Sequence, residues 1–261
     1  MRNFTASQAL GALLLALLLG FAFLQPYFYP MDIGFQDLSN ILATPDGESW
    51  LGTDHLGRDM LARLAAAIRL SFGLSLFSVA CALLAGLLCG ILAGLFGGWI
   101  DRLFSFGCDI IMALPGLLLI LLFAALSPGS FWTLYLGISL VMWVEFFRVV
   151  RAVTLTLAGS SELQSSRLMG MPWGYCIKRH LLPRLLPLIA TLTAFSIGNA
   201  ILALATLGFI SVGLRPPTAE LGLMMTELFP YYYQAPLIFL QPVLAVFLLV
   251  LSLQLLSGKV K

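Results

Sequence analysis

Six apolar stretches limit what this chain can fold into. Each has at least the length of about 20 residues with which an α-helix crosses the hydrocarbon core of a membrane. Because 60% of the residues are hydrophobic and 10% are charged, a single soluble core cannot bury this much apolar surface. We therefore expect an all-α integral membrane protein with about six transmembrane helices, close to residues 8–28, 72–96, 103–126, 131–150, 187–213 and 236–256.

The first apolar stretch has a second interpretation as a cleaved signal peptide, because Arg2 precedes it. Its run from Ala9 to Phe28 is longer than the apolar region of such peptides, about 7–15 residues, and no small-residue cleavage site follows it. We expect a retained helix.

Basic residues are distributed unevenly between the two sides of such a bundle. Six crossings place both termini and the connections near 97–102 and 148–186 on one side. The opposite loops, 29–70 and 214–235, hold eight of the twelve acidic residues. Because loops rich in Lys and Arg remain in the cytoplasm, we expect both termini to be cytoplasmic. That side holds ten of the fourteen basic residues: Arg2, Arg102, Arg148, Arg151, Arg167, Lys178, Arg179, Arg184, Lys259 and Lys261.

A polar island, SSELQSSRLMGMPWGYCIKRHLLPRLLP at residues 160–187, separates two apolar stretches. Its pattern predicts a short helix that ends at Gly170, which accepts a left-handed cap conformation. Pro172 suits the start of a second helix, and Pro183 and Pro187 are expected to break the chain before the next span. The result is a helix–turn–helix bracket across the cytoplasmic face.

Two roles for this bracket remain open from its residues alone. Arg179 and His180 suit contacts with phospholipid head groups. A compact helix pair with apolar and basic residues also suits docking into a groove of a partner protein.

Four glycines at a spacing of four residues mark the second apolar stretch. This spacing keeps them on one helix face, where another helix approaches closely. We interpret this face as a packing surface, with a smooth pore wall as the alternative: Gly86, Gly90, Gly94 and Gly98.

The chain lacks the sequence motifs of common enzymes. It has no G-x-x-x-x-G-K-[ST] phosphate loop, no G-x-S-x-G and no H-E-x-x-H. Asp101 and Asp109 raise the hypothesis of an intramembrane aspartyl hydrolase, but no second acid lies at comparable depth in another span. Glu145 and Arg148 have the spacing of a local ion pair. We expect no catalytic residues.

Metal, cofactor and nucleic-acid sites are not expected either. His55 and His180 each stand alone, and the four Cys form no C-x-x-C pair. The chain also lacks a basic stripe large enough to neutralise many phosphates.

One spacing within residues 160–187 resembles the EAA loop of ABC importer permeases. Gly170 is followed after six residues by Ile177, after two more by His180, and then by Leu182 and Pro183. This order is similar to the loop of the peptide and nickel branch of that family. Further likeness lies in WLGTDHLGRDMLARL, which resembles a signature of one permease subunit of this branch, and in GGWIDRLFSFGCDIIMALP and LGFISVGLRPPTAELGLMM.

The chain departs from the family at the triplet that names the loop. Gln164, Ser165 and Ser166 stand where the family has an acidic residue and two alanines, and Arg167 follows as in the family. The Met-Arg pair usual in the third span is also absent near Phe106.

The resemblance implies a type I ABC importer fold with a cytoplasmic coupling helix between spans four and five. Residues 1–70 would then form an N-terminal transmembrane helix with an extracytoplasmic segment, and residues 71–261 a five-helix transmembrane domain. The residues of the loop that would couple to the ATPase are Gln164, Ser165, Ser166, Arg167, Gly170, Ile177, Arg179, His180 and Pro183.

The implied function is that of a non-enzymatic permease subunit in the bacterial inner membrane. Its partners would be a second homologous permease, two cytoplasmic ATPases that bind ATP and Mg²⁺, and an extracytoplasmic solute-binding protein. The substrates of this branch are nickel and other metal chelates or di- and oligopeptides, and PTAE at 217–220 is more similar to the nickel type. The alternative is an ion-coupled secondary transporter that works without ATPase subunits.

Overall fold

The computed structural model describes residues 5–47 and 49–258. Arg2, Lys259 and Lys261, which contribute to the predicted orientation, lie outside these ranges. Within them the chain is helical and forms no strand beyond an isolated bridge between Thr53 and Asp59. The expected all-α membrane fold is confirmed. The long helices are α1 (Ala6–Phe28), α2 (Met60–Phe96), α3 (Gly98–Met112), α4 (Gly116–Leu126), α5 (Phe131–Ala158), α8 (Leu182–Phe209) and α10 (Pro236–Ser257).

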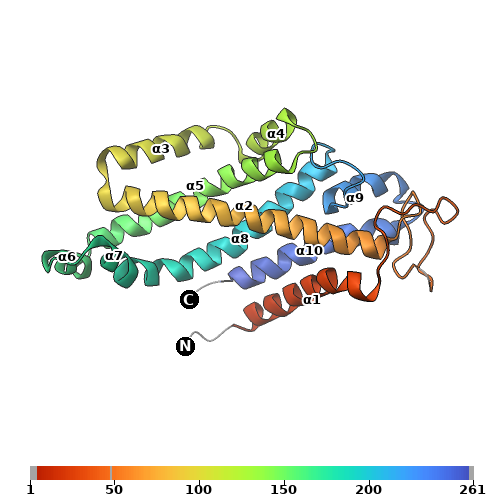
Figure 1. Cartoon of the computed structure of the whole chain (residues 1–261), viewed down its shortest axis with the longest axis horizontal. Coiled ribbons are helices and arrows are strands. Elements are labelled where there is room, and N and C mark those ends of the chain that lie inside the picture. Colours follow the sequence, from red (N-terminus) through yellow and green to blue (C-terminus); the bar gives the residue numbers. More distant parts are fainter. Residues whose placement is uncertain (1–4, 48, 259–261) are drawn as a thin grey trace.

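The helices run back and forth along one axis (Figure 1). Five of them are long and apolar enough to cross a membrane, and α3 with α4 makes a sixth candidate span. One end of the bundle, here called the α6 end, carries α6 (Ser161–Leu168) and α7 (Trp173–Cys176). The opposite end, the α9 end, carries α9 (Leu221–Leu228) and the 29–59 loop.

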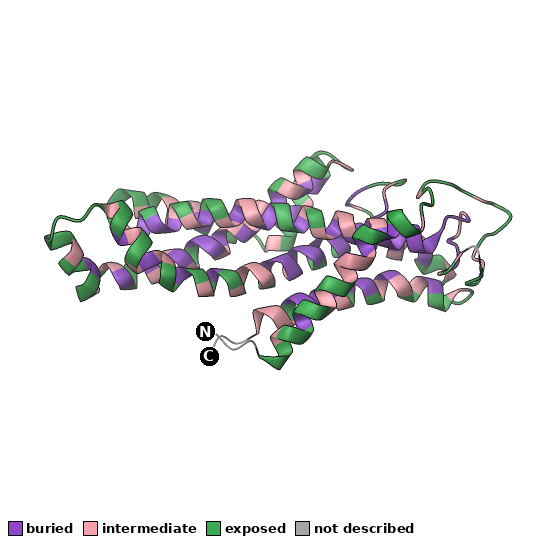
Figure 2. Ribbon diagram, turned by 60° about the horizontal axis from the view of Figure 1, so that its bottom comes forward, coloured by how far each residue is buried: buried purple, intermediate pink, exposed green. Residues whose placement is uncertain are grey.

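Apolar side chains cover much of the outside of the bundle. Leu84, Leu88 and Phe247 are each exposed on a long helix, whereas Phe146 and Ile201 are buried within the bundle. Figure 2 shows exposed and buried residues alternating along the long helices. Such an apolar exterior suits lipid rather than water as the solvent.

The predicted third span is not one straight helix. Residues 103–126 were expected to form a single crossing, but α3 and α4 meet at 81° across residues 113–115. Pro115 is the cause at this position, since proline has no backbone N–H and restricts the residue before it to an extended conformation. The span is therefore a bent pair.

Pro183 and Pro187 do not break the chain, contrary to expectation. Both lie within α8, and Trp173–Phe209 forms one helical run of 37 residues. Pro183 lies in the first turn of α8, where proline is tolerated. The turn before it, η1 (Ile177–Leu181), is a π-helix, in which the backbone N–H of Leu182 bonds the carbonyl of Ile177.

The glycine face of α2 packs against α5. A Cβ atom added to Gly90 would lie 2.8 Å from the Cβ of Val150, and one added to Gly94 would lie 2.6 Å from the Cβ of Thr154. Gly86 approaches Phe146 in the same way. Gly98 does not join this seam, because α2 ends at Phe96 and Gly98 begins α3 in open space.

Candidate functional site

The 160–187 segment forms a helical bracket that projects from the α6 end (Figure 1). Gly170 follows α6 with a φ of +80°, the left-handed conformation that glycine adopts at little cost. The backbone N–H of Met171 then donates to the carbonyl of Ser166 at 3.1 Å. This bond runs across the turn as in a Schellman cap. It confirms where the first helix of the bracket ends.

Arg167 ties the turn to the second helix. Its guanidinium lies 4.2 Å from the centre of the Trp173 ring, in a cation–π contact. The same side chain donates from Nη1 to the carbonyl of Met171 at 2.7 Å. Both contacts hold the α6 and α7 helices in one geometry.

Two longer-range contacts join α6 to the segment that follows α7. The Ser166 hydroxyl lies 2.9 Å from Nε2 of His180. The Glu162 carboxylate accepts from Nη2 of Arg184 at 2.6 Å, an ion pair between exposed side chains. Together with Arg167, these contacts make the bracket a braced unit.

The tip of the bracket presents two apolar side chains to solvent. Leu168, the last residue of α6, is 89% exposed, and Met169, which follows it, is 76% exposed. Leu163 of α6, by contrast, is buried. Large apolar side chains at an exposed tip are suited to burial in a groove of another protein.

A second cluster of charges lies buried at the α9 end. Arg58 contacts the carboxylates of Asp54 at 2.6 Å and Glu227 at 2.9 Å. Arg63 contacts the same two carboxylates at 3.3 Å and 2.8 Å. The Arg63 side chain is only 1% exposed. Two cations and two anions therefore neutralise one another where the 29–59 loop, α2 and α9 meet.

Local structure places these charges. Asp54 also accepts from the backbone N–H groups of Leu56 and Arg58, each at 2.9 Å. Asp59 caps the N-terminus of α2 by accepting from the backbone N–H of Ala62 at 2.7 Å. The stretch LGTDHLGRD thus supplies a buried anion, a buried cation and a helix cap within six residues, 54–59.

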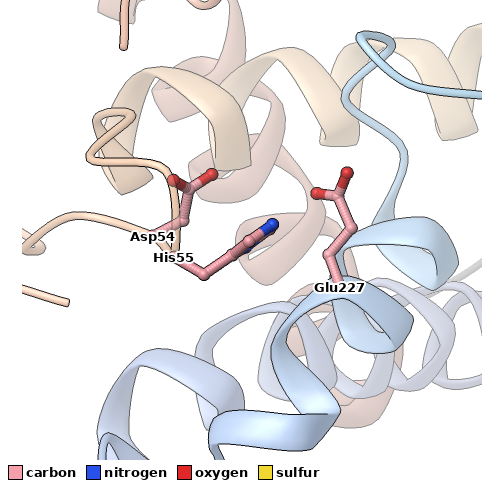
Figure 3. A group of neighbouring side chains, drawn as sticks. All are labelled: Asp54, His55 and Glu227. Atoms are coloured by element: carbon pink, nitrogen blue, oxygen red, sulfur yellow. The ribbon is translucent and has the colours of Figure 1, made fainter. Parts of the chain in front are cut away.

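His55 lies beside this cluster (Figure 3). Its ring stacks on Tyr231 at 5.5 Å, and burial lowers the pKa of the imidazole. Ligand atoms of Asp54, His55 and Glu227 lie within 4.8 Å of one another, close enough to surround a metal ion. Both carboxylates already bind Arg58 and Arg63, so an incoming cation would meet two guanidinium charges.

Comparison with known proteins bears on both regions. The family model described as "Binding-protein-dependent transport system inner membrane component" matches residues 86–260, a range that contains the whole bracket. The chain belongs to this family. The permease is therefore a membrane subunit of the ABC importer class, whose members work together with a further permease, ATPases and a binding protein.

Named relatives of the permease place it in the peptide and nickel branch. It is 33% identical over 248 residues to the glutathione transport system permease protein GsiD of Pectobacterium atrosepticum, covering 95% of this chain and 82% of that protein. It is 31% identical over 255 residues to the nickel transport system permease protein NikC of Escherichia coli, covering 98% and 92%. The resemblance inferred from the motifs is confirmed.

The bracket brings together most of the residues that the resemblance assigned to the coupling loop of the permease. Gln164, Ser165 and Arg179 are exposed on its outside, and Ile177 is half-buried. Pro183 lies in the last part of the bracket, in the first turn of α8. Leu168 and Met169 were not selected from the sequence, although two apolar residues directly before a helix-ending glycine are a recognisable signal.

The charge cluster was also missed, for a different reason. Asp54 and Glu227 are far apart in the sequence, and neither has a local ion-pair pattern that involves the other. The expected local pair between Glu145 and Arg148 does not form among the described residues: Arg148 instead places Nη1 3.0 Å from the sulfur of Met112.

Glu220 connects the α9 end to the bundle of the permease. It caps α9 by accepting from the backbone N–H of Leu223 at 2.8 Å, and Ser71 of α2 donates to its other oxygen at 3.4 Å. A Cβ atom at Gly208 would collide with this carboxylate, so the glycine leaves room for the Glu220 side chain where α8 meets α9. Burial raises the pKa of Glu220.

Proposed function

We propose that this permease transmits the motion of partner ATPases into the membrane through the bracket at residues 160–187, and so drives the uptake of small peptides or nickel chelates. The observation that carries the proposal is the continuity of the bracket with α8. Trp173–Phe209 is one helical run, about 55 Å long at 1.5 Å per residue. A displacement at its first turn reaches the opposite end of the bundle.

The contacts within the bracket support this role. A docking element that moves as a body must not deform when a partner pushes on it. The cation–π contact of Arg167 with Trp173 and the bond between Ser166 and His180 resist such deformation. Leu168 and Met169 then offer an apolar surface to the ATPase at the tip.

The orientation follows from the same proposal. The α6 end lies in the cytoplasm, where the ATPases bind ATP and Mg²⁺, and both termini lie on that side. The α9 end faces outwards, towards a solute-binding protein, and the permease resides in the bacterial inner membrane with a second permease beside it. No cofactor or catalytic group is assigned to this chain.

The substrate is proposed from two kinds of relative. One is named for glutathione transport and the other for nickel transport, at nearly equal identity to this chain. Both fit an importer in which the binding protein selects the solute.

A charge at the tip of the bracket tests the coupling role. We expect Leu168→Asp to abolish co-purification of the ATPase subunits with the permease, because an exposed apolar anchor becomes charged. Insertion should be unaffected, since Leu168 is 89% exposed and supports no core. The readouts are pull-down of the ATPases and the amount of permease in the membrane.

Leu38→Asp is the matched control, because Leu38 is an exposed leucine at the α9 end. It should leave ATPase binding unchanged. Retention of the ATPases by Leu168→Asp would contradict the coupling role. Uptake of solute by this chain alone in liposomes, without any ATPase, would instead establish the secondary-transporter alternative.

A further inference from the structure

A cleft lined by both polar and apolar residues lies between α3 and α5, two helices that are labelled in Figure 1. Its volume is about 590 Å³. The α3 wall carries Ser105 and Asp109, and the α5 wall carries Arg148 and Arg151. These two helices belong to candidate membrane spans, where charged side chains are costly and usually face protein or a water-filled cavity.

The sequence of α3 directs its polar residues to this cleft. Asp101, Ser105 and Asp109 follow one another at intervals of four, so they share a face of the helix. Leu103 and Phe106, on the remaining surface, are exposed apolar residues. The polar face therefore meets α5, and the apolar face is left for lipid or a partner helix.

Two of the four charges in this region neutralise each other. Arg151 of α5 donates from Nη2 to Oδ2 of Asp101 at 2.6 Å, with a second contact from Nε to Oδ1. This pair bridges the two helices on one side of the cleft. Because Arg151 and Asp101 neutralise each other, neither is available to bind a charged ligand.

The other two charges have no ionic partner among the described residues. No described carboxylate lies within 4.0 Å of Arg148, whose guanidinium instead contacts the sulfur of Met112. Asp109 has no cation within 4.0 Å in the same part of the chain. Both side chains are exposed. One wall thus offers an available positive charge and the facing wall an available negative charge.

We propose that this cleft is a transit site for a small zwitterionic peptide, with Arg148 binding a carboxylate of the peptide and Asp109 binding its ammonium group. The inference rests on the proposed import function and specifies its substrate class. Guanidinium–carboxylate pairs are strong and directional, and the cleft volume is in the range of small-ligand sites. A free divalent cation would be attracted to Asp109 but repelled by Arg148. These two side chains therefore favour a zwitterionic peptide over the cation.

Binding of dipeptide probes tests the proposal without transport. The membrane complex of the two permeases and two ATPases in detergent, without ATP and without the binding protein, is equilibrated with radiolabelled alanyl-alanine, with its C-terminal amide and with its N-acetyl derivative. We expect saturable binding of alanyl-alanine and roughly tenfold weaker binding of each blocked form, the loss typical of one charged hydrogen-bonded contact. Glutathione is a second probe with both charges.

Two variants assign the two ends of the peptide. Arg148→Gln should weaken alanyl-alanine binding to the level of the amide and leave amide binding unchanged. Asp109→Asn should weaken alanyl-alanine binding to the level of the N-acetyl form and leave binding of the N-acetyl form unchanged. Arg102→Gln is the control, since Arg102 lies on α3 but does not line the cleft, and it should bind all probes like the unmodified importer.

Three results would overturn the assignment. The first is the absence of saturable binding of alanyl-alanine and glutathione. The second is an equal loss of affinity for alanyl-alanine and for its C-terminal amide in Arg148→Gln. The third is tighter binding of Ni²⁺ than of either peptide. A failure of the coupling proposal gives a different result from a failure of this one. In that case the ATPases still co-purify with Leu168→Asp, and peptide binding at the cleft is unchanged.

Discussion

At the scale of single residues, the charges of this permease are used in two different ways. At the α9 end, Arg63 and its partners are removed from solvent and neutralised in place. At the α6 end, Glu162 and Arg184 form a solvent-exposed ion pair. The energetic consequences of breaking the two kinds of pair differ, because an uncompensated buried charge is far more costly than an exposed one.

Glu227→Gln should therefore destabilise the permease strongly. It leaves Arg58 and Arg63 with one carboxylate between them, and breaking a buried pair costs about 3–5 kcal/mol. The control Glu162→Gln breaks the exposed pair with Arg184 and should cost about 0–1 kcal/mol. Thermal unfolding of both variants in detergent provides the comparison, and equal shifts in melting temperature would contradict it.

Glu220 should make stability depend on pH. Its folded pKa is raised by burial above the ordinary value of 4.5, so the folded state holds the proton where the unfolded state has lost it. The stabilisation associated with the protonated form is present at acidic pH and decreases as pH rises through the folded pKa. Glu220→Gln should remove this component, and the difference in melting temperature between variant and parent should grow with pH. A constant difference would contradict the buried-carboxylate explanation.

At the scale of secondary-structure elements, the seam between α2 and α5 is the most extensive helix pairing in the described part of the chain. Gly90→Val should separate the helices, because even a Cβ atom there lies 2.8 Å from Val150, and overpacking costs about 1–3 kcal/mol. Gly73→Val is the control on the same helix, since nothing lies within 4 Å of its added Cβ. The free energy of unfolding should fall for Gly90→Val and change little for Gly73→Val.

The elements differ in how far the sequence predicts them. Long apolar stretches identify the spans, because a membrane requires helices of defined length. Pro115 signals the bend between α3 and α4, but Pro187 has the same chemistry and produces no break within α8. Only the surrounding packing distinguishes the two prolines, and packing is not visible in a local pattern.

In the candidate site, too, local features are predictable from the sequence and contacts between separate helices are not. Gly170 predicts the turn of the bracket, since its left-handed conformation is a local property. Arg58 joins Asp54 to Glu227, and Asp109 and Arg148 line the same cleft, only because separate helices come together. Such contacts become predictable only when the helix arrangement is known.

At the scale of the whole molecule, both described chain ends point towards the α6 end (Figure 1). We expect a reporter fused after residue 258 to be located in the cytoplasm and one inserted at Gly47, in the exposed 29–59 loop, to be located outside. Enzymatic reporters that are active on only one side of the membrane measure this. A shared location for the two reporters would mean an even number of crossings between Gly47 and residue 258, and would contradict the expected topology.

The continuity of Trp173–Phe209 also limits how this chain can vary in length. Each residue of an α-helix adds about 100° of rotation and 1.5 Å of rise. One inserted residue would therefore turn the bracket away from its orientation relative to Gly208, which packs against Glu220 at the other end. A loop such as 29–59 can accommodate an insertion locally. An insertion in this helix would instead change the rotation of one end of the bundle relative to the other.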